Sequence, residues 1–252
     1  TCPRITVVAE AGAQASIVEL HWSATDGPTL SLPVVECWVE PQAHLEWVKV
    51  QAEGPEARHI ALNEFSQTAD SELRHVNITL GGLLTRNDTN VTIGGSNALT
   101  RLDGIVCLEE NQLADNHTRL DHQKPHCESH EVYKHLLNGE STAVFNGKIF
   151  VHQDAQKTDA KQTNQAILLS PTATMNSKPQ LEIFADDVKC THGATVGQLE
   201  SSMEFYLRSR GISATEARSL LTLAFVGEVL DLIQVESVRE TVGDMLRAKL
   251  LS

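Results

Sequence analysis

Apolar and polar positions alternate in short segments over most of the chain, from Ile5 to about Ile183. Polar corners separate these segments and recur at roughly 23 to 31 residues, a period typical of solenoid proteins. A short strand in such a repeat cannot bury its inner face alone, so stacked coils share one continuous core. The segments are 17–20, 45–50, 76–80, 105–108, 149–151 and 167–169, and the corners lie near Gly12, Gln42, Asp70, Gly95, Gln123, Asp154 and Ser177. The pattern predicts a mainly β chain, with a β-helix as the simplest arrangement.

A two-sheet sandwich is the alternative, because it also needs many short alternating strands. Sandwich strands are commonly joined by tight hairpins, and this chain has few hairpin signals. The candidates are Asn146-Gly147, Gly81-Gly82 and Gly94-Gly95. Their scarcity favours coils over a sandwich.

The pattern becomes helical after about residue 194. Three hydroxyl residues each stand three positions before Glu or Gln, a capping-box spacing that predicts helix starts at Thr195, Ser213 and Ser237. Gly211 is expected to end the first helix in the left-handed conformation. We therefore divide the chain into a β-helix core at 1–194 and a small C-terminal α-helical domain at 195–252. These helices are expected to cap the end of the solenoid, to offer a docking face to a partner, or to do both.

Charge and composition narrow the function classes. The net charge of −13 argues against an extended surface for nucleic acid or anionic membrane. The five cysteines are odd in number and widely spread, which fits neither a disulfide framework nor a structural zinc site, so we expect reduced thiols in the cytoplasm or an organelle matrix. The chain begins with Thr1 and reads as a strand from Ile5, so we expect a fragment that lacks its N-terminal region.

Cys190 and His192 are the most suggestive pair of chemical groups. They stand two residues apart just before the helical part, and two residues apart on a strand point to one face. A thiolate and an imidazole placed in this way could meet one metal or cluster. A buried Cys beside a hydrogen-bonded His is the alternative interpretation.

A second group of histidines lies between 117 and 135: His117, His122, His126, His130 and His135. The spacing of His126 and His130 could bind zinc on a helix, with Asp115 or Glu131 completing the site. Pro125 and the polar surroundings instead indicate corners of coils. Polar side chains that face solvent or form ladders are the expectation favoured here.

No enzyme motif is present. The chain contains no P-loop, no nucleophile elbow, no zinc-protease motif and no dinucleotide fingerprint, so we expect a non-enzymatic protein. A carbohydrate-active β-helix enzyme with paired carboxylates, at Asp186 and Asp187 or at Glu109 and Glu110, remains the alternative from another class. Adjacent carboxylates on a strand point to opposite faces, which weakens both pairs. A purely structural solenoid that binds other proteins is the third possibility.

Several strings occur in an order that is characteristic of one family. They are 186–197 (DDVKCTHGATVG), 205–212 (FYLRSRGI), 144–149 (VFNGKI), 157–164 (KTDAKQTN) and 178–183 (KPQLEI). Together they resemble the SufB/SufD family of the SUF iron–sulfur cluster assembly machinery, strongly from about His117 to about Phe225 and faintly before. Residues 178–182 (KPQLE) occupy the position at which the SufB branch is expected to have a cluster-binding cysteine. The resemblance is therefore to the SufD branch.

The resemblance implies a right-handed parallel β-helix and a non-catalytic scaffold role. It implies partnership with a SufB-like paralogue in a heterodimer and with a SufC-like ABC ATPase, and a homodimer is possible for the isolated chain. His192, with Cys190 as a weaker candidate, would handle iron or a nascent cluster at the interface with the paralogue. Tyr206, Arg208 and Arg210 would contact the ATPase. No cofactor would be bound stably by this chain alone, and the location would be the cytoplasm, or the plastid stroma in a plant or alga.

Overall fold

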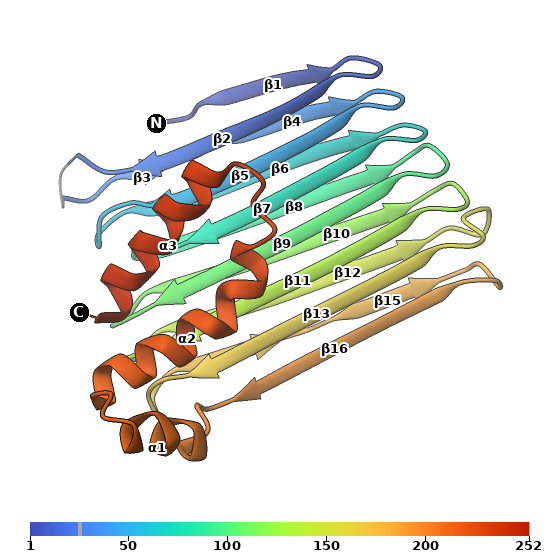
Figure 1. Cartoon of the computed structure of the whole chain (residues 1–252). Coiled ribbons are helices and arrows are strands. Elements are labelled where there is room, and N and C mark those ends of the chain that lie inside the picture. Colours follow the sequence, from blue (N-terminus) through green and yellow to red (C-terminus); the bar gives the residue numbers. More distant parts are fainter. Residues whose placement is uncertain (25–26, 252) are drawn as a thin grey trace.

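Two parallel β-sheets face each other along the length of the molecule in the computed structural model, which describes residues 1–24 and 27–251 (Figure 1). The first sheet contains, in spatial order, β1 (Arg4–Ala9), β4 (Val34–Val39), β6 (Arg58–Gln67), β8 (Leu84–Ile93), β10 (Leu113–His122), β12 (Thr142–Val151) and β14 (Thr174–Ser177), with β3 (Leu30–Ser31) beside β6 and β15 (Gln180–Ile183) beside β12. The second contains β2 (Gln14–Trp22), β5 (His44–Ala52), β7 (Glu72–Thr79), β9 (Leu99–Leu108), β11 (Glu128–Leu137), β13 (Asp159–Leu168) and β16 (Lys189–Gly197). The chain alternates between the sheets, so the predicted parallel β-helix is confirmed.

The length of a coil varies while its register is kept. Arg58 pairs with Leu84, which is 26 residues later, and Thr142 pairs with Thr174, which is 32 residues later. The loops absorb this difference, because the paired strands of successive coils stay aligned residue by residue. The predicted period was therefore close, although its lower limit was too short.

One corner of the coil forms a ladder of hydrogen bonds that stabilises the stacking. A residue with positive φ occupies this corner in six successive coils: Gly12, Gln42, Asp70, Asn97, His126 and Lys157. The backbone N–H of each donates to a carbonyl oxygen of the next coil, as Gln42 does to Ala69 and His126 does to Gln156. Left-handed backbone is strained for residues other than Gly, so the inter-coil bonds hold a conformation that costs energy locally.

The interior is apolar along its two corners and polar between them. Val39, Leu45 and Ile93 belong to the cluster beside the corner ladder, and Leu108 and Leu137 belong to a cluster on the opposite side. Buried amide and hydroxyl side chains fill the space between: Asn63, Asn77, Asn87, Thr89, Asn116, Thr118, Gln162 and Asn164. They form a column of polar groups along the solenoid axis.

Helices cover the outer face of the second sheet (Figure 1). They are α1 (Ser201–Ser209), α2 (Ala214–Leu230) and α3 (Glu236–Leu251). Val226 and Val229 of α2 and Leu246 of α3 belong to one apolar cluster with outward-facing residues of the sheet, among them Val76 and Ile78 of β7 and Ile105 and Cys107 of β9. The prediction that the helices cap the end of the solenoid was wrong. The apolar surface that α2 and α3 bury lies on the outer face of the second sheet.

Polar ties add to this apolar contact. Lys134 of β11 forms an ion pair with Glu228 at 2.6 Å and donates to the Phe225 carbonyl of α2 at 2.8 Å. The backbone N–H of Gln234 donates to Glu46 of β5 at 2.6 Å, and Lys249 of α3 pairs with Glu109 at 2.6 Å. The pair α2–α3 is thus clamped to the solenoid at three separate coils.

The predicted helix boundaries were right at one of three starts. Ser213 caps α2, and its hydroxyl and Glu216 form the complete capping box. Thr195 instead lies in β16, which runs to Gly197 and so passes the predicted domain boundary at 194. Ser237 lies inside α3, which begins at Glu236. Gly211 has φ +87°, as expected for the residue after α1.

No helix in the described part of the chain is long and apolar enough to cross a membrane.

Candidate functional site

Cys190 and His192 lie on β16, the last strand of the second sheet. Cys190 pairs with Ala160 of β13 and His192 pairs with Gln162. Ala160 and Gln162 are buried inside the solenoid, and parity along the strand therefore turns Cys190 and His192 toward the same interior side at its open end. Cys190 is half-buried, and this burial raises the pKa of its thiol. His192 is exposed.

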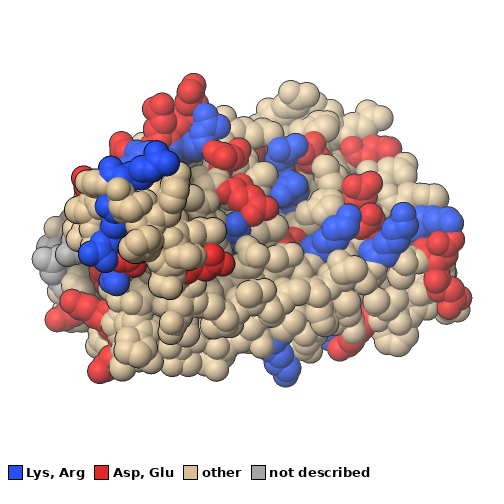
Figure 2. Space-filling model, turned by 60° about the horizontal axis from the view of Figure 1, so that its bottom comes forward, with Lys and Arg blue, Asp and Glu red and all other residues tan. Residues whose placement is uncertain are grey.

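β16 is an exposed edge that carries no charged side chain after Lys189, its first residue. Its one described partner is β13, so its other side presents unpaired backbone groups. From Cys190 to Leu199 the sequence contains no Lys, Arg, Asp or Glu, and most of β16 is exposed. Folded proteins usually protect such an edge with charges, bulges or a covering element. Figure 2, which turns the bottom of Figure 1 forward, shows interspersed acidic and basic side chains together with a broad area that carries no charge.

A buried amide and a buried carboxylate lie behind His192. Gln162 of β13 donates from Nε2 to Glu131 Oε2 of β11 at 2.6 Å. Burial raises the pKa of the Glu131 carboxyl to about 7, and the side chains of Thr118 and Gln162 oppose this rise. Gly147 makes room for the amide, because a Cβ at that position would lie 2.3 Å from Gln162 Nε2. The polar column therefore continues to the strand that carries His192.

The opposite end of the column holds a charged network. Glu19 accepts hydrogen bonds from Trp47 at 2.8 Å and from His21 at 2.5 Å. Burial alone would raise the Glu19 pKa, but His21, Lys49 and Trp47 lower it to about 2. Burial lowers the pKa of Lys49 to about 8 against the attraction of Glu19 and Glu53. Lys49 also donates to Asn87 at 2.9 Å, so the buried ammonium is held by groups from several coils.

The histidines between 117 and 135 do not form one site. His117 lies on the outer face, 2.9 Å from Asp115, whereas His122 is buried beside Ser129. His126 occupies a left-handed corner, and His135 is buried in the interior. No group of three or more His, Cys, Asp or Glu side chains that could hold a metal ion occurs among residues 1–24 and 27–251. The expectation of a coil corner is met at His126, but the expectation of solvent-facing side chains was wrong for His122 and His135, which are buried in β10 and β11.

The carboxylates proposed for a glycosidase are engaged elsewhere. Asp187 forms an ion pair with Lys157 at the corner ladder. Glu109 pairs with Lys249 of α3, and Glu110 occupies a left-handed corner. One carboxylate of each pair is therefore held in an ion pair.

α1 exposes an apolar and aromatic surface. None of its residues is buried, and Met203, Phe205 and Tyr206 are 52%, 74% and 57% exposed. Arg210 donates to the Tyr206 hydroxyl at 3.1 Å and lies over its ring, while Arg208 reaches Glu204 at 3.8 Å. The predicted residues Tyr206, Arg208 and Arg210 therefore lie on one short segment.

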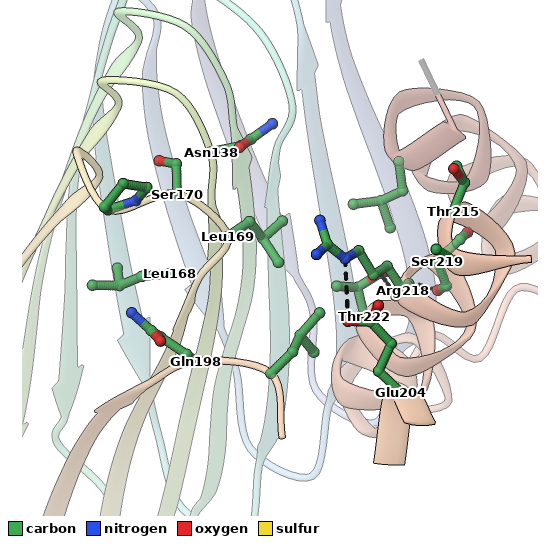
Figure 3. Close-up of a pocket in the computed structure, with 14 residues that line it drawn as sticks. Asn138, Leu168, Leu169, Ser170, Gln198, Glu204, Thr215, Arg218, Ser219 and Thr222 are labelled. Atoms are coloured by element: carbon green, nitrogen blue, oxygen red, sulfur yellow. Dashed lines mark hydrogen bonds and ion pairs between the residues drawn. The ribbon is translucent and has the colours of Figure 1, made fainter. Parts of the chain in front are cut away.

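A pocket of about 450 Å³ separates α1 and α2 from the last coils (Figure 3). Leu168, Leu169 and Ser170 line it on the solenoid side, and Arg218 and Thr222 line it on the helix side. The Arg218–Glu204 ion pair, at 3.3 Å, joins α2 to α1 across its margin. α1 is thus held by α2 and stands apart from the sheet.

Reasoning from sequence missed Gln162, Met203 and Phe205, and it named Glu131 only as a possible zinc ligand. The signal for Gln162 was an alternating segment with polar residues on both faces, Asp-Ala-Lys-Gln-Thr-Asn at 159–164, which an apolar core does not explain. The signal for Met203 and Phe205 was their spacing of two residues. Two residues apart on a helix point to different faces, so both cannot be buried by one apolar stripe.

A family model and several known proteins match this chain. A family model described as the SUF system FeS cluster assembly SufBD core domain matches residues 1–225, so the likeness includes the first coils as well. The chain is 36% identical over 231 residues to the iron–sulfur cluster assembly protein SufD of Escherichia coli, covering 92% of this chain and 55% of that protein. It is 36% identical over 245 residues to a SufBD family protein of Synechocystis, with 94% and 54% covered. It is 34% identical over 240 residues to the chloroplastic protein ABCI7 of Arabidopsis thaliana, with 94% and 50% covered. The chain spans about half the length of these relatives, and it belongs to the SufBD core domain family of the SUF iron–sulfur cluster assembly system.

Proposed function

We propose that this chain is the core of a non-catalytic SufD-type subunit that helps to assemble iron–sulfur clusters. In this proposal, β16 pairs with a SufB-like paralogue, and His192 contributes to iron entry or nascent cluster assembly at the joint. The observation that carries it is the position of His192 and Cys190 on an exposed strand edge that has no charged side chain after Lys189. The family membership supports the pathway.

The edge favours a protein partner of similar architecture. An extended strand can add to an open sheet edge through main-chain hydrogen bonds, and side chains facing alternate sides then provide specificity. β16 offers nine residues for this purpose. A second copy of the same chain could use the same edge, which would give the homodimer expected for the isolated protein.

Cys190 and His192 supply two ligands at most. An iron or cluster site usually needs four, and no third His, Cys, Asp or Glu of the described chain joins them in a group. The remaining ligands would come from the paralogue or from sulfide. We therefore propose that the cluster is cargo at the interface, and that this chain alone binds no cofactor stably.

The exposed surface of α1 suits a SufC-like ATPase. Met203, Phe205 and Tyr206 offer apolar area, and Arg208 and Arg210 add cationic groups beside it. Residues 198–200 are all that separate α1 from β16. Movement of the ATPase would therefore pull directly on the strand that carries His192, whereas α2 and α3 stay clamped.

Anaerobic reconstitution with the paralogue and the ATPase tests the site. His192→Ala should reduce the iron and sulfide bound to the complex, while His130→Ala, on the outer face of β11, should leave both unchanged. Normal assembly with His192→Ala would show that the solenoid has a structural role only.

Two further variants test the ATPase contact. Phe205→Ser should weaken copurification with the ATPase, and Leu220→Ser, at a 50% exposed position of α2, serves as the matched control. A flexible spacer of about ten Gly and Ser residues between Leu199 and Glu200 should keep ATPase binding and lower ATP-dependent assembly, because it removes the mechanical link. Full ATP-dependent assembly with the spacer would exclude transmission through residues 198–200.

A further inference from the structure

Gln162 lies between a fixed carboxylate and the proposed site. β13 is flanked by β11 on one side and by β16 on the other. Across the first pair Gln162 faces Glu131, and across the second pair it faces His192. The Gln162 side chain therefore stands between the buried Glu131 carboxyl and the exposed His192 imidazole.

Glu131 fixes which end of the amide points inward. Oε2 of Glu131 is the acceptor in this pair and selects the NH₂ group of Gln162, with 2.6 Å between Nε2 and Oε2. Above the Glu131 pKa of about 7 the carboxylate carries no proton that it could donate to the other end of the amide. The side chain cannot move toward β12, because the backbone of Gly147 lies directly against it. The Oε1 atom of Gln162 is left as an acceptor that is buried and has no partner among the described residues.

A buried acceptor without a partner has lost its hydrogen bond to water and gained none in return, so it destabilises the fold. The residue in register on the free side of β13 is His192, whose exposed imidazole can turn. Its ring N–H is the group in this position that can satisfy Gln162 Oε1. We infer that Gln162 is a positioning residue for His192: its Oε1 accepts a hydrogen bond from one ring nitrogen and thereby leaves the lone pair of the other nitrogen free for iron.

This inference rests on the proposed function and adds a positioning residue to the same site. Histidines that bind metals generally donate their second ring N–H to a nearby acceptor, which fixes the tautomer and the ring orientation. Here the acceptor would come from the chain itself, so His192 would be oriented before a partner arrives. Cys190 lies two residues before His192 on the same strand. It pairs in register with Ala160, whose side chain has no hydrogen-bond acceptor.

NMR of the ring nitrogens tests the inference on the full chain. Histidine-specific ¹⁵N labelling gives the tautomer ratio of each of the 11 histidines, and the spectrum of His192→Gln assigns the signal of interest. At pH 8, where the Glu131 carboxyl is ionised, we expect one tautomer to dominate at His192 in the wild type. Gln162→Leu should shift the ratio by about fivefold, the change that corresponds to one hydrogen bond of about 1 kcal/mol.

Asn164→Leu is the matched control. Asn164 is also buried beside β16 but pairs in register with Ala194, so its loss removes an amide from the same wall without a histidine opposite. An equal shift of the His192 ratio in Asn164→Leu and Gln162→Leu would overturn the inference, and so would no shift in Gln162→Leu. If Gln162→Leu does not fold, Glu131→Gln provides the test: an amide at 131 can face Gln162 with either end, so the tautomer preference should weaken.

The two proposals can fail separately. If His192→Ala assembles clusters normally while Gln162→Leu changes the tautomer ratio, positioning stands and the cluster role falls. If His192→Ala abolishes assembly while the ratio is the same in all variants, the cluster role stands and positioning falls.

Discussion

Glu131→Gln should make the protein more stable at alkaline pH. Glu131 is fully buried, and its pKa rises from 4.5 to about 7. Since each pKa unit corresponds to about 1.4 kcal/mol, the burial of this carboxyl costs on the order of 3 kcal/mol once it is ionised. The amide of Gln has nearly the same shape and can still accept from Gln162, so the variant avoids this cost.

The direction of the pH dependence follows from proton binding. Between pH 4.5 and 7 the folded protein retains the Glu131 proton and the unfolded chain releases it, so this group lowers stability progressively as the pH rises and has its full effect above 7. His75, His122 and His135 act in the opposite direction, because burial lowers each pKa to about 4 and the folded state then loses stability in acid. These histidines are present in both proteins, so their contributions cancel in the difference.

Urea unfolding followed by circular dichroism, repeated from pH 4.5 to 8, measures that difference. The stability gain of Glu131→Gln should be small at pH 4.5 and should grow to about 3 kcal/mol at pH 8. Glu128→Gln, an exposed position on the same strand, should show no such growth. A difference between Glu131→Gln and wild type that stays constant over this range would show that the Glu131 carboxyl has an ordinary pKa, and would refute the reasoning.

Three further changes probe the corners and the helix clamp. Gly139→Ala should destabilise the fold by more than about 2 kcal/mol, because φ is +65° and the new Cβ would lie 2.7 Å from the Glu110 nitrogen, whereas Gly193→Ala meets open space and should change little. His126→Gly should raise the urea midpoint by the equivalent of about 1 kcal/mol, since φ is +62° at this corner; a lower midpoint would mean that the imidazole has a stabilising role. Lys134→Met should remove the buried clamp and speed hydrogen exchange in α2 by roughly tenfold or more, and unchanged exchange would assign the docking to apolar contact alone.

The sequence predicted the coil repeat well because the corners carry a local backbone requirement. The expected corners at Gly12, Gln42 and Asp70 coincide with left-handed residues, and those expected at Gly95, Gln123 and Asp154 lie two or three residues from Asn97, His126 and Lys157. Ser177 was wrong, since it lies in β14. Gly, Asn and Asp tolerate positive φ and are visible in a sequence, but His and Lys at such positions are not.

Tertiary context decided what the sequence could not. Thr195 has a capping spacing, yet β13 offers a complete row of partners and β16 therefore continues as a strand through Gly197. The location of α2 and α3 depended on outward-facing Val76 and Ile78, whose alternation resembles that of any buried strand. The face shared by Cys190 and His192 followed from strand parity, whereas the Glu131–Gln162 contact required the three-dimensional register.

The clamp of α2 and α3 limits how this solenoid can change in length. Gln234 is tied to β5, Lys249 to the end of β9, and Lys134 on β11 to α2. A whole coil inserted beyond β11 would preserve the corner ladder, but one inserted between β5 and β11 would move these anchors apart by about 4.8 Å. The attached helix pair therefore fixes the number of coils between β5 and β11. Insertions among relatives should be confined to the loops or to the two ends of the stack.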